Sequence, residues 1–179
     1  MLKKILLGTA GVIVAGIAIV LVLALNKPDV FQVQRSASIK APPEKIFPLI
    51  NDLQAFNRWS PYEQKDPAMK RSYNGPASGT GASYAWDGNS EVGKGRITIA
   101  ESSPSSKIRF NLEMIDPMEA NNVIEFTLRP QGDATLVTWA MQGKCPFIGK
   151  VMQVIFDMDK MVGTDFANGL ANLKAIAEK

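Results

Sequence analysis

Most of the chain after residue 68 is a series of short alternating segments that ends in one long amphipathic segment. Alternation is clearest from Ile108 to Met114, where every second residue is apolar. Turn residues separate the segments, and connections this short favour antiparallel neighbours. The six predicted strands cover residues 68–74, 80–87, 92–102, 106–115, 119–129 and 134–143.

The last segment, from Phe147 to Ala177, is predicted to be one long helix, because apolar residues recur every three or four positions. A curved antiparallel sheet with one apolar face needs a cover, and this helix is the only long element available. The sheet should therefore wrap around the helix and leave a cavity where the wrap is incomplete. Gly163 and Gly169 each cost about 1 kcal/mol in a helix, which predicts a kink or a close backbone contact.

One further strand and two short helices precede the six strands. Residues 31–39 alternate as a half-buried strand, and Pro43 opens a short helix. Asn51-Asp52 ends that helix and caps a second one, Leu53 to Arg58, which stops at Trp59-Ser60-Pro61. Trp59 is expected either to pack inward or to form a rim at a pocket mouth or membrane interface.

The N-terminal run from Ile5 to Leu25 is uncharged and, apart from Thr9, apolar. As a helix it would extend about 30 Å, which matches the hydrocarbon thickness of a bilayer. The run is longer than the apolar core of a cleaved signal peptide, and no clean cleavage site follows it. We therefore expect residues 1–25 to be an uncleaved transmembrane anchor, 26–29 a short linker and 30–179 a single domain.

The charges on either side of this run predict its orientation. Lys3 and Lys4 precede it, whereas Lys27 after it is offset by Asp29. The positive-inside rule places the N-terminus in the cytoplasm and the domain outside. In a bacterium, the domain would then be periplasmic and held at the cell membrane.

Composition excludes several kinds of function. The net charge of +3 arises largely from Lys3 and Lys4, and no basic stripe follows, so a nucleic-acid partner is not expected. The chain has no histidine and a single cysteine, Cys145, which excludes His-dependent triads, His-ligated zinc and an internal disulfide. We expect no metal, no cofactor and a structural, partly buried Cys145; the oligomeric state is left open.

Two glycine pairs and four carboxylates have both structural and functional interpretations. Gly79-Thr80-Gly81 and Gly93-Lys94-Gly95 are predicted to be turns or strand bends, because neither has the third glycine of a phosphate loop. A buried carboxylate would have a raised pKa and could act as an acid or base, whereas solvated positions need no activity. The carboxylates nearest the expected sheet interior are Asp87, Glu91, Glu113 and Glu125.

The order β-α-α-β-β-β-β-β-β-α and a set of short motifs resemble the START / Bet v 1-like (SRPBCC) superfamily, and within it the bacterial polyketide cyclase/dehydrase and lipid-transport family. The resemblance covers residues 30–179. It implies an α+β helix-grip fold around a hydrophobic ligand pocket. The motifs are Ile39-x-Ala41-Pro42-Pro43-x-x-Ile46-Phe47, Trp59-Ser60-Pro61, the two glycine pairs, Thr135-x-Val137-x-Trp139, Met158-Asp159-Lys160 and Phe166-x-x-Gly169-Leu170-x-x-Leu173-Lys174.

These observations favour a membrane-tethered protein that binds a hydrophobic small molecule or lipid between the sheet and the last helix. A polar group such as Tyr84 or Arg96 would orient the head of the ligand, and no catalytic residue is assigned. A protein-interaction module with a filled core and a cyclase- or dehydratase-like enzyme stay open as alternatives. The predicted ligand-binding residues are Tyr84, Trp86, Phe110, Met114, Trp139, Met141, Met152 and Phe156.

Overall fold

The computed structural model describes the backbone of residues 2–179 and the side chains of residue 9 and residues 11–179. The chain divides into two compact units. The helical unit comprises the chain up to Phe31 together with Lys144–Met158. The sheet unit comprises Gln32–Gly143 and Asp159–Lys179.

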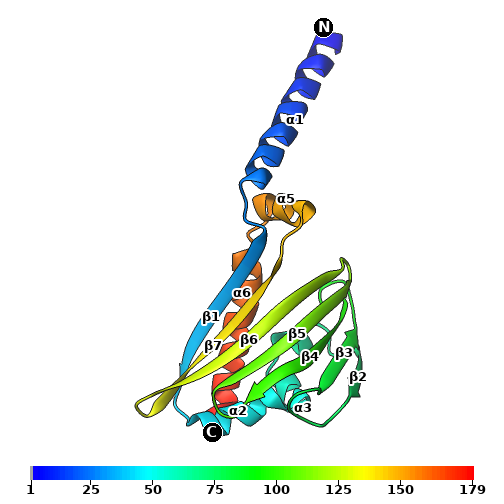
Figure 1. Ribbon diagram of the computed structural model, residues 1–179. Coiled ribbons are helices and arrows are strands. Elements are labelled where there is room, and N and C mark those ends of the chain that lie inside the picture. Colours follow the sequence, from blue (N-terminus) through cyan, green and yellow to red (C-terminus); the bar gives the residue numbers. More distant parts are fainter. Residues whose placement is uncertain (1) are drawn as a thin grey trace. The chain divides into compact units, whose positions relative to one another are not determined.

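The described residues form a seven-stranded sheet in the order β1-β7-β6-β5-β4-β3-β2 (Figure 1). Consecutive strands from β2 to β7 pair antiparallel, as the short turns predict. The strands are β1 (Val30–Ile39), β2 (Lys70–Asn74), β3 (Ser83–Asp87), β4 (Lys94–Ser103), β5 (Lys107–Asp116), β6 (Ala120–Gln131) and β7 (Ala134–Lys144).

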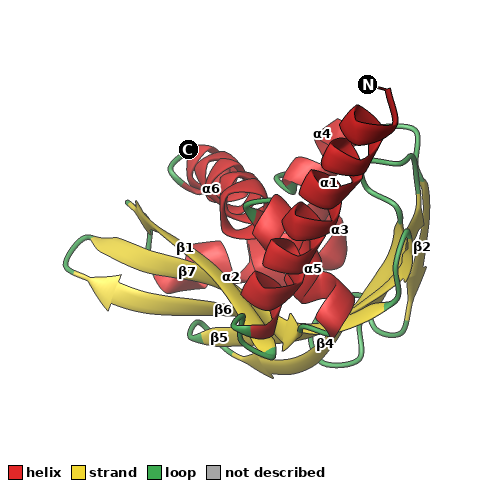
Figure 2. Cartoon of the chain, turned by 90° about the horizontal axis from the view of Figure 1, so that it is seen from above, coloured by secondary structure: helices red, strands yellow, loops and turns green. Residues whose placement is uncertain are grey.

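Helices of the sheet unit lie within the curve of the sheet (Figure 2). They are α2 (Pro43–Asn51), α3 (Leu53–Asn57), α4 (Pro61–Lys65) and α6 (Met158–Ala177). Asp52 caps α3 as predicted, because its Oδ1 accepts hydrogen bonds from the backbone N–H groups of Gln54 (2.8 Å) and Ala55 (3.3 Å). The helix α4 was not predicted; Pro61 begins it, in the first-turn position that proline favours.

Aromatic rings from the sheet, α3 and α6 pack together as the centre of the sheet unit. Trp139 on β7 stacks on Phe166 of α6, with ring centroids 4.1 Å apart and planes 11° apart. Phe126 lies 4.9 Å from Trp139, and Trp59 meets Trp139 edge-on at 5.6 Å. Trp59 is buried and its Nε1 donates to the carbonyl of Leu49 at 2.8 Å, so the inward interpretation of Trp59 is confirmed.

The prediction of one long helix from Phe147 to Ala177 was wrong. The structure has α5 (Phe147–Ile155) and α6, with Phe156 and Asp157 between them. Phe156 is extended (φ −120°, ψ 137°), and Asp157 immediately precedes the first turn of α6. Aspartate favours helix starts over helix interiors, which is the local reason for a break that the apolar periodicity hides.

Both glycines of α6 permit a close approach, as predicted. A Cβ on Gly169 would lie 2.6 Å from the Trp139 ring and 3.0 Å from Cδ of Pro61. A Cβ on Gly163 would meet the Arg35 guanidinium, whose Nη1 and Nη2 reach the Asp159 carboxylate at 3.1 and 3.0 Å. These hydrogen bonds hold the pKa of Asp159 below its usual value.

The helical unit contains α1 (Leu2–Leu25) and α5, which contact each other. Cys145 is buried in this unit, as predicted, and its Sγ accepts a hydrogen bond from Gln153 at 2.8 Å. Among the described residues, no helix is both long enough and apolar enough to cross a membrane. The side chains of residues 1–8 and of Ala10 belong to the predicted anchor and lie outside the described residues.

The two α6 glycines predict effects of different size for the same substitution. Gly169→Ala is expected to lower the free energy of unfolding by about 1–3 kcal/mol, because Trp139 and Pro61 are rigid and overpacking outweighs the better helix propensity of alanine. Gly163→Ala displaces the Arg35 guanidinium from the exposed Asp159, and the better helix propensity of alanine offsets the loss of this exposed ion pair, so stability should change by less than about 0.5 kcal/mol. Urea unfolding of both variants checks this; equal effects would contradict it.

Candidate functional site

The sheet unit has a cleft of about 480 Å³ between α4, the β3–β4 loop and α6. Pro61, Gln64 and Lys65 come from α4, which places them on one wall. Glu91 comes from the loop that connects β3 and β4. The α6 wall is formed by residues at helical spacing, which are Asp165, Asn168, Ala171 and Asn172.

An ion pair crosses the cleft. Lys65 Nζ donates to Asp165 Oδ2 at 2.7 Å, and the two side chains are only 33% and 19% exposed. The Lys65 ammonium also lies 5.4 Å from the centre of the Tyr62 ring. Burial, and secondly the negative charge of Asp165, raise the pKa of Tyr62, so this hydroxyl stays protonated at neutral pH.

Hydrogen bonds hold α4 against its neighbours at the cleft. Asn172 of α6 donates through Nδ2 to the carbonyl of Trp59 at 3.1 Å, just before α4 begins. At the other end, Asn89 in the β3–β4 loop donates through its Nδ2 to the Lys65 carbonyl at 3.2 Å. Its backbone N–H also donates to Asp66 Oδ2 at 2.7 Å. The three walls are therefore connected by side chains that are themselves held in place.

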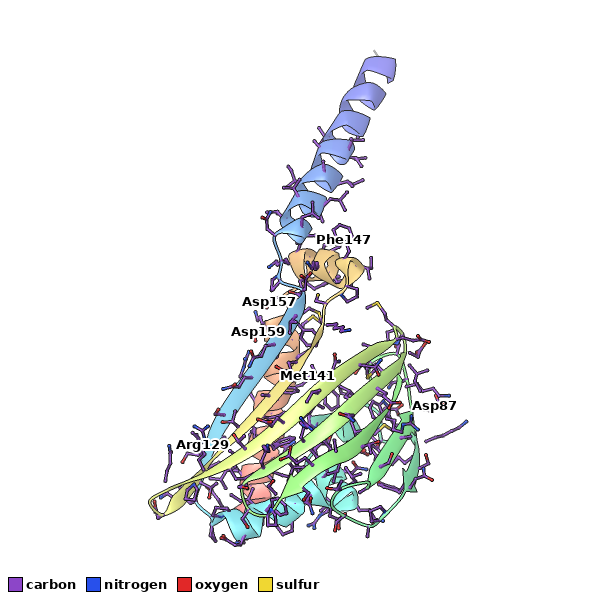
Figure 3. The ribbon with its side chains drawn as sticks, viewed as in Figure 1. Asp87, Arg129, Met141, Phe147, Asp157 and Asp159 are labelled. Atoms are coloured by element: carbon purple, nitrogen blue, oxygen red, sulfur yellow. The ribbon has the colours of Figure 1, made fainter. Side chains whose placement is uncertain are left out.

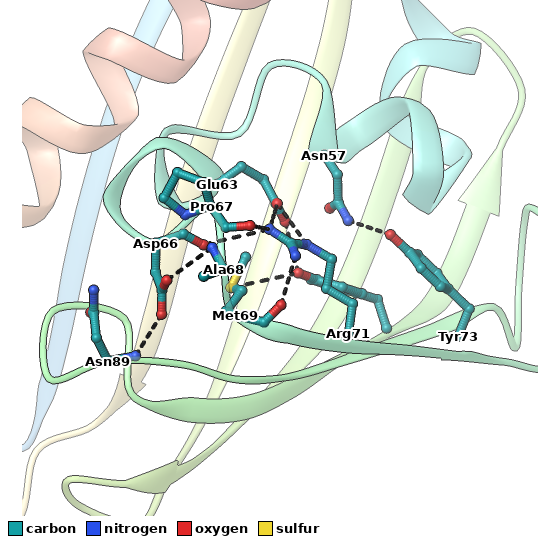
Figure 4. Close-up of polar contacts among 10 residues, drawn as sticks. Asn57, Glu63, Asp66, Pro67, Ala68, Met69, Arg71, Tyr73 and Asn89 are labelled. Carbon is teal, nitrogen blue, oxygen red and sulfur yellow. Dashed lines mark hydrogen bonds and ion pairs between the residues drawn. The ribbon is translucent and has the colours of Figure 1, made fainter.

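A polar cluster around Glu63 fixes the other face of α4 to strands β2 and β3 (Figure 4). Arg71 donates through Nε and Nη2 to Glu63 Oε2 at 2.8 and 2.6 Å, and through Nη1 to the carbonyl of Met69 at 2.6 Å. Tyr84 donates to the other carboxylate oxygen of Glu63 at 2.7 Å. Glu63 on α4 thus accepts hydrogen bonds from side chains of both β2 and β3, a role that no sequence motif indicated.

This cluster also perturbs its titratable groups. Burial raises the pKa of Tyr84 strongly, with further contributions from its hydrogen bond to Glu63 and from the charge of that carboxylate. Burial and Glu63 raise the pKa of Tyr73 as well, and the hydrogen bond to Glu63 raises that of Arg71. Both tyrosines are neutral at physiological pH: Tyr84 donates its hydroxyl proton to Glu63, whereas the Tyr73 hydroxyl oxygen accepts a hydrogen bond from Asn57 Nδ2 at 2.5 Å.

The strand register places the six predicted ligand-binding residues of the sheet on one face. Trp86 is opposite Gly95, which is opposite Met114, and Phe110 is opposite Ile124, which is opposite Met141. Phe110 and Trp139 lie inside the aromatic core, and Tyr84 and Met141 are buried, whereas Trp86 and Met114 are partly exposed. Figure 3 shows Met141 on β7, far across the sheet from Asp87.

The other two predicted residues, Met152 and Phe156, belong to the helical unit and are exposed. Ligand binding by the predicted set stays a prediction. The register corrects one suggestion, because Arg96 follows the inward-facing Gly95 and therefore lies on the outer face of the sheet. There it pairs with Glu113 at 2.5 Å and cannot orient a ligand inside the fold.

The four carboxylates considered for acid–base chemistry lie at the edges or on the outer face of the sheet unit. Asp87 pairs with Lys94 at 3.2 Å, and both side chains are about half exposed. Glu91 is exposed at the cleft, and Glu125 is partly exposed on the outer face opposite Arg109. Within the part of the chain that the structure describes, no three His, Cys, Asp or Glu residues are grouped to hold a metal ion.

The sheet wrapped on α6, with short helices closing one side, defines an α+β protein of Bet v 1-like fold. Residues 30–178 match the family of polyketide cyclases/dehydrases and lipid-transport proteins, and the chain belongs to that family. No curated protein matches the sequence.

Solved structures share this fold at low sequence identity. Protein CV1439 from Chromobacterium violaceum is 16% identical with a TM-score of 0.60, and the match covers 86% of this chain and 99% of that one. The Aha1 dimer from Colwellia psychrerythraea is 18% identical with a TM-score of 0.59, covering 83% and 96%. The di-domain ARO/CYC StfQ from the steffimycin biosynthetic pathway is 12% identical with a TM-score of 0.62, covering 83% and 51%.

The raised tyrosine pKa in the polar cluster around Glu63 predicts that the folded protein loses stability at alkaline pH. A tyrosine with a raised pKa in the folded state remains protonated above about pH 10, where tyrosines of the unfolded chain ionise. The native state then binds more protons than the unfolded state, so stability is full below about pH 10 and falls as the pH rises further. Urea unfolding between neutral pH and pH 11 should show this decline.

Glu63→Gln should make the decline shallower, because it removes the negative charge that helps to raise the pKa of Tyr84. The matched control is Glu113→Gln, which removes a paired carboxylate on the outer face and should leave the alkaline decline unchanged. Identical pH dependence in wild type and Glu63→Gln would contradict the assigned role of Glu63.

Proposed function

We propose that the chain is a non-enzymatic binding protein for a small amphipathic molecule or lipid, with the cleft between α4 and α6 as its entry and head-group site. The observation that carries the proposal is the cleft itself. Its volume of about 480 Å³ lies within the range of small-molecule sites, and hydrogen bonds support its walls. Membership of a family that includes lipid-transport proteins agrees with a ligand of this kind.

The lining favours a head group that carries both donors and acceptors. Gln64, Asn168 and Asn172 present amides, and Lys65 and Asp165 present opposite charges already paired with each other. A ligand with a single strong charge would have to break that pair, whereas a neutral or zwitterionic head can join it.

The apolar part of the ligand would contact the inner end of the cleft. Pro61 lines the cleft and also lies against Gly169, beside the Trp139 ring. The Nε1 of Trp139 is buried and has no hydrogen-bond partner among the described residues. Each methylene that the ligand buries against the apolar lining, Pro61 and Ala171, contributes about 0.8 kcal/mol.

Filling the cleft tests the proposal. Ala171→Trp should abolish a co-purifying ligand detected by native mass spectrometry of the full chain released from lipid nanodiscs. Ala167→Trp is the matched control, since Ala167 is an exposed residue of the same helix outside the cleft lining, and it should retain the ligand. Equal occupancy in both variants would contradict binding in this cleft.

The close packing of the aromatic core favours a second candidate, a protein-interaction module whose interior is filled. The same experiment separates the two candidates. A wild-type chain that carries no ligand, and that shows no mass shift with added fatty acid or phospholipid, would favour the interaction module.

We also propose that residues 5–25 tether the domain to the cell membrane, with the N-terminus in the cytoplasm and the domain outside. The support is the uncharged apolar run and the lysines that precede it. Cys145 is buried and unsuited to labelling, so the test uses Asp133→Cys in the exposed β6–β7 turn with Cys145→Ser. An impermeant maleimide should label this cysteine in intact spheroplasts; labelling only after lysis would reverse the orientation.

A further inference from the structure

The helix α5 of the helical unit has its polar and apolar sides reversed relative to a helix of a soluble core. Its one charged residue, Lys150, is only 13% exposed and binds Asp29 Oδ1 at 2.5 Å. Gln153 donates to Cys145 Sγ, and Gly149 lies against the same sulfur. The polar side of α5 therefore faces the rest of its own unit, where Lys150 pairs with Asp29, whose side chain is 92% exposed.

The opposite side of α5 is uncharged and faces outward. Ile148 and Ile155 are 56% and 58% exposed, Phe147, Met152 and the following Phe156 are also exposed, and none of the α5 residues is buried. Figure 3 shows Phe147 at the beginning of this helix. At 3.6 residues per turn, Ile148, Met152 and Ile155 share one side.

An exposed apolar side of this kind needs an apolar partner. Within the same unit α5 contacts α1, in which most described residues from Val12 to Leu25 are apolar and exposed, while Ala24 is buried. The two helices are therefore in contact, and both expose uncharged apolar side chains. Nine residues rise only about 14 Å, too short to span a bilayer but suited to its interface.

We propose that α5 lies in the membrane interface beside α1, with Ile148, Met152 and Ile155 among the lipid chains. This inference rests on the proposed membrane tether. The ion pair between Lys150 and Asp29 holds α5 to the segment that follows α1, so both helices meet the same bilayer surface. Lys27 and Lys144 flank the two helices and suit the level of the lipid phosphates.

Spin labels on the full chain test the depth of α5. In a Cys145→Ser background, which keeps an acceptor for Gln153, nitroxides are attached to Ile148→Cys, Ile155→Cys, Val14→Cys and Asp133→Cys. The protein is reconstituted into vesicles of phosphatidylcholine and phosphatidylglycerol in equal parts. Power saturation then compares collisions with oxygen, which concentrates in lipid, and with a water-soluble nickel chelate.

The ratio of oxygen to nickel accessibility should be several-fold higher for the two α5 labels than for the label at residue 133. If the label at residue 14 is in lipid but the α5 labels favour nickel, the α5 inference is overturned while the tether stands. If the label at residue 14 also favours nickel, both are overturned. Spin–spin broadening between α5 labels, with low access to both reagents, would show that a second copy covers this side and would overturn the lipid assignment.

Discussion

The sheet unit depends on the contact between Trp139 of β7 and α6. The Trp139 ring stacks on Phe166 and lies against Gly169, where the absence of a side chain lets the helix come close. Pro61 packs on the same glycine, and it begins α4. One close approach therefore joins the sheet, the last helix and one wall of the cleft. Aromatic stacking adds about 0.5–1.5 kcal/mol per pair to the area buried, and the neighbouring rings extend it.

The cleft lies beside the region where the ligand pocket was expected. Phe110 and Trp139, which were expected to line a pocket, pack against other rings instead. The polar cleft forms where α4 is held on one side by Glu63 and on the other by the pair of Lys65 with Asp165. The cleft is lined by hydrogen-bonding and charged side chains together with Pro61 and Ala171, whereas the aromatic rings behind it are enclosed by their own packing.

Local patterns predicted much of the fold, and long-range contacts limited the prediction of the site. Alternation and turn residues located all seven strands, and Asp52 was identified as a cap from its position alone. The break at Phe156-Asp157 was missed, because the apolar periodicity continues through it even though α5 and α6 belong to different units. The pairing of Glu63 with Arg71 and Tyr84 joins a short helix to two strands, and no spacing in the sequence indicates it.

The sequence by itself determined the order of the seven strands and the first two short helices, the close approach at Gly163 and Gly169 as one of two expected outcomes, and the apolar character of the N-terminal run. These follow from periodicity, turn chemistry and side-chain size, which act over a few residues. Only the tertiary structure decided that the aromatic face is packed, that the cleft is polar and that α5 turns its lysine inward. Those outcomes depend on which distant side chains meet, and a one-dimensional pattern does not encode such contacts directly.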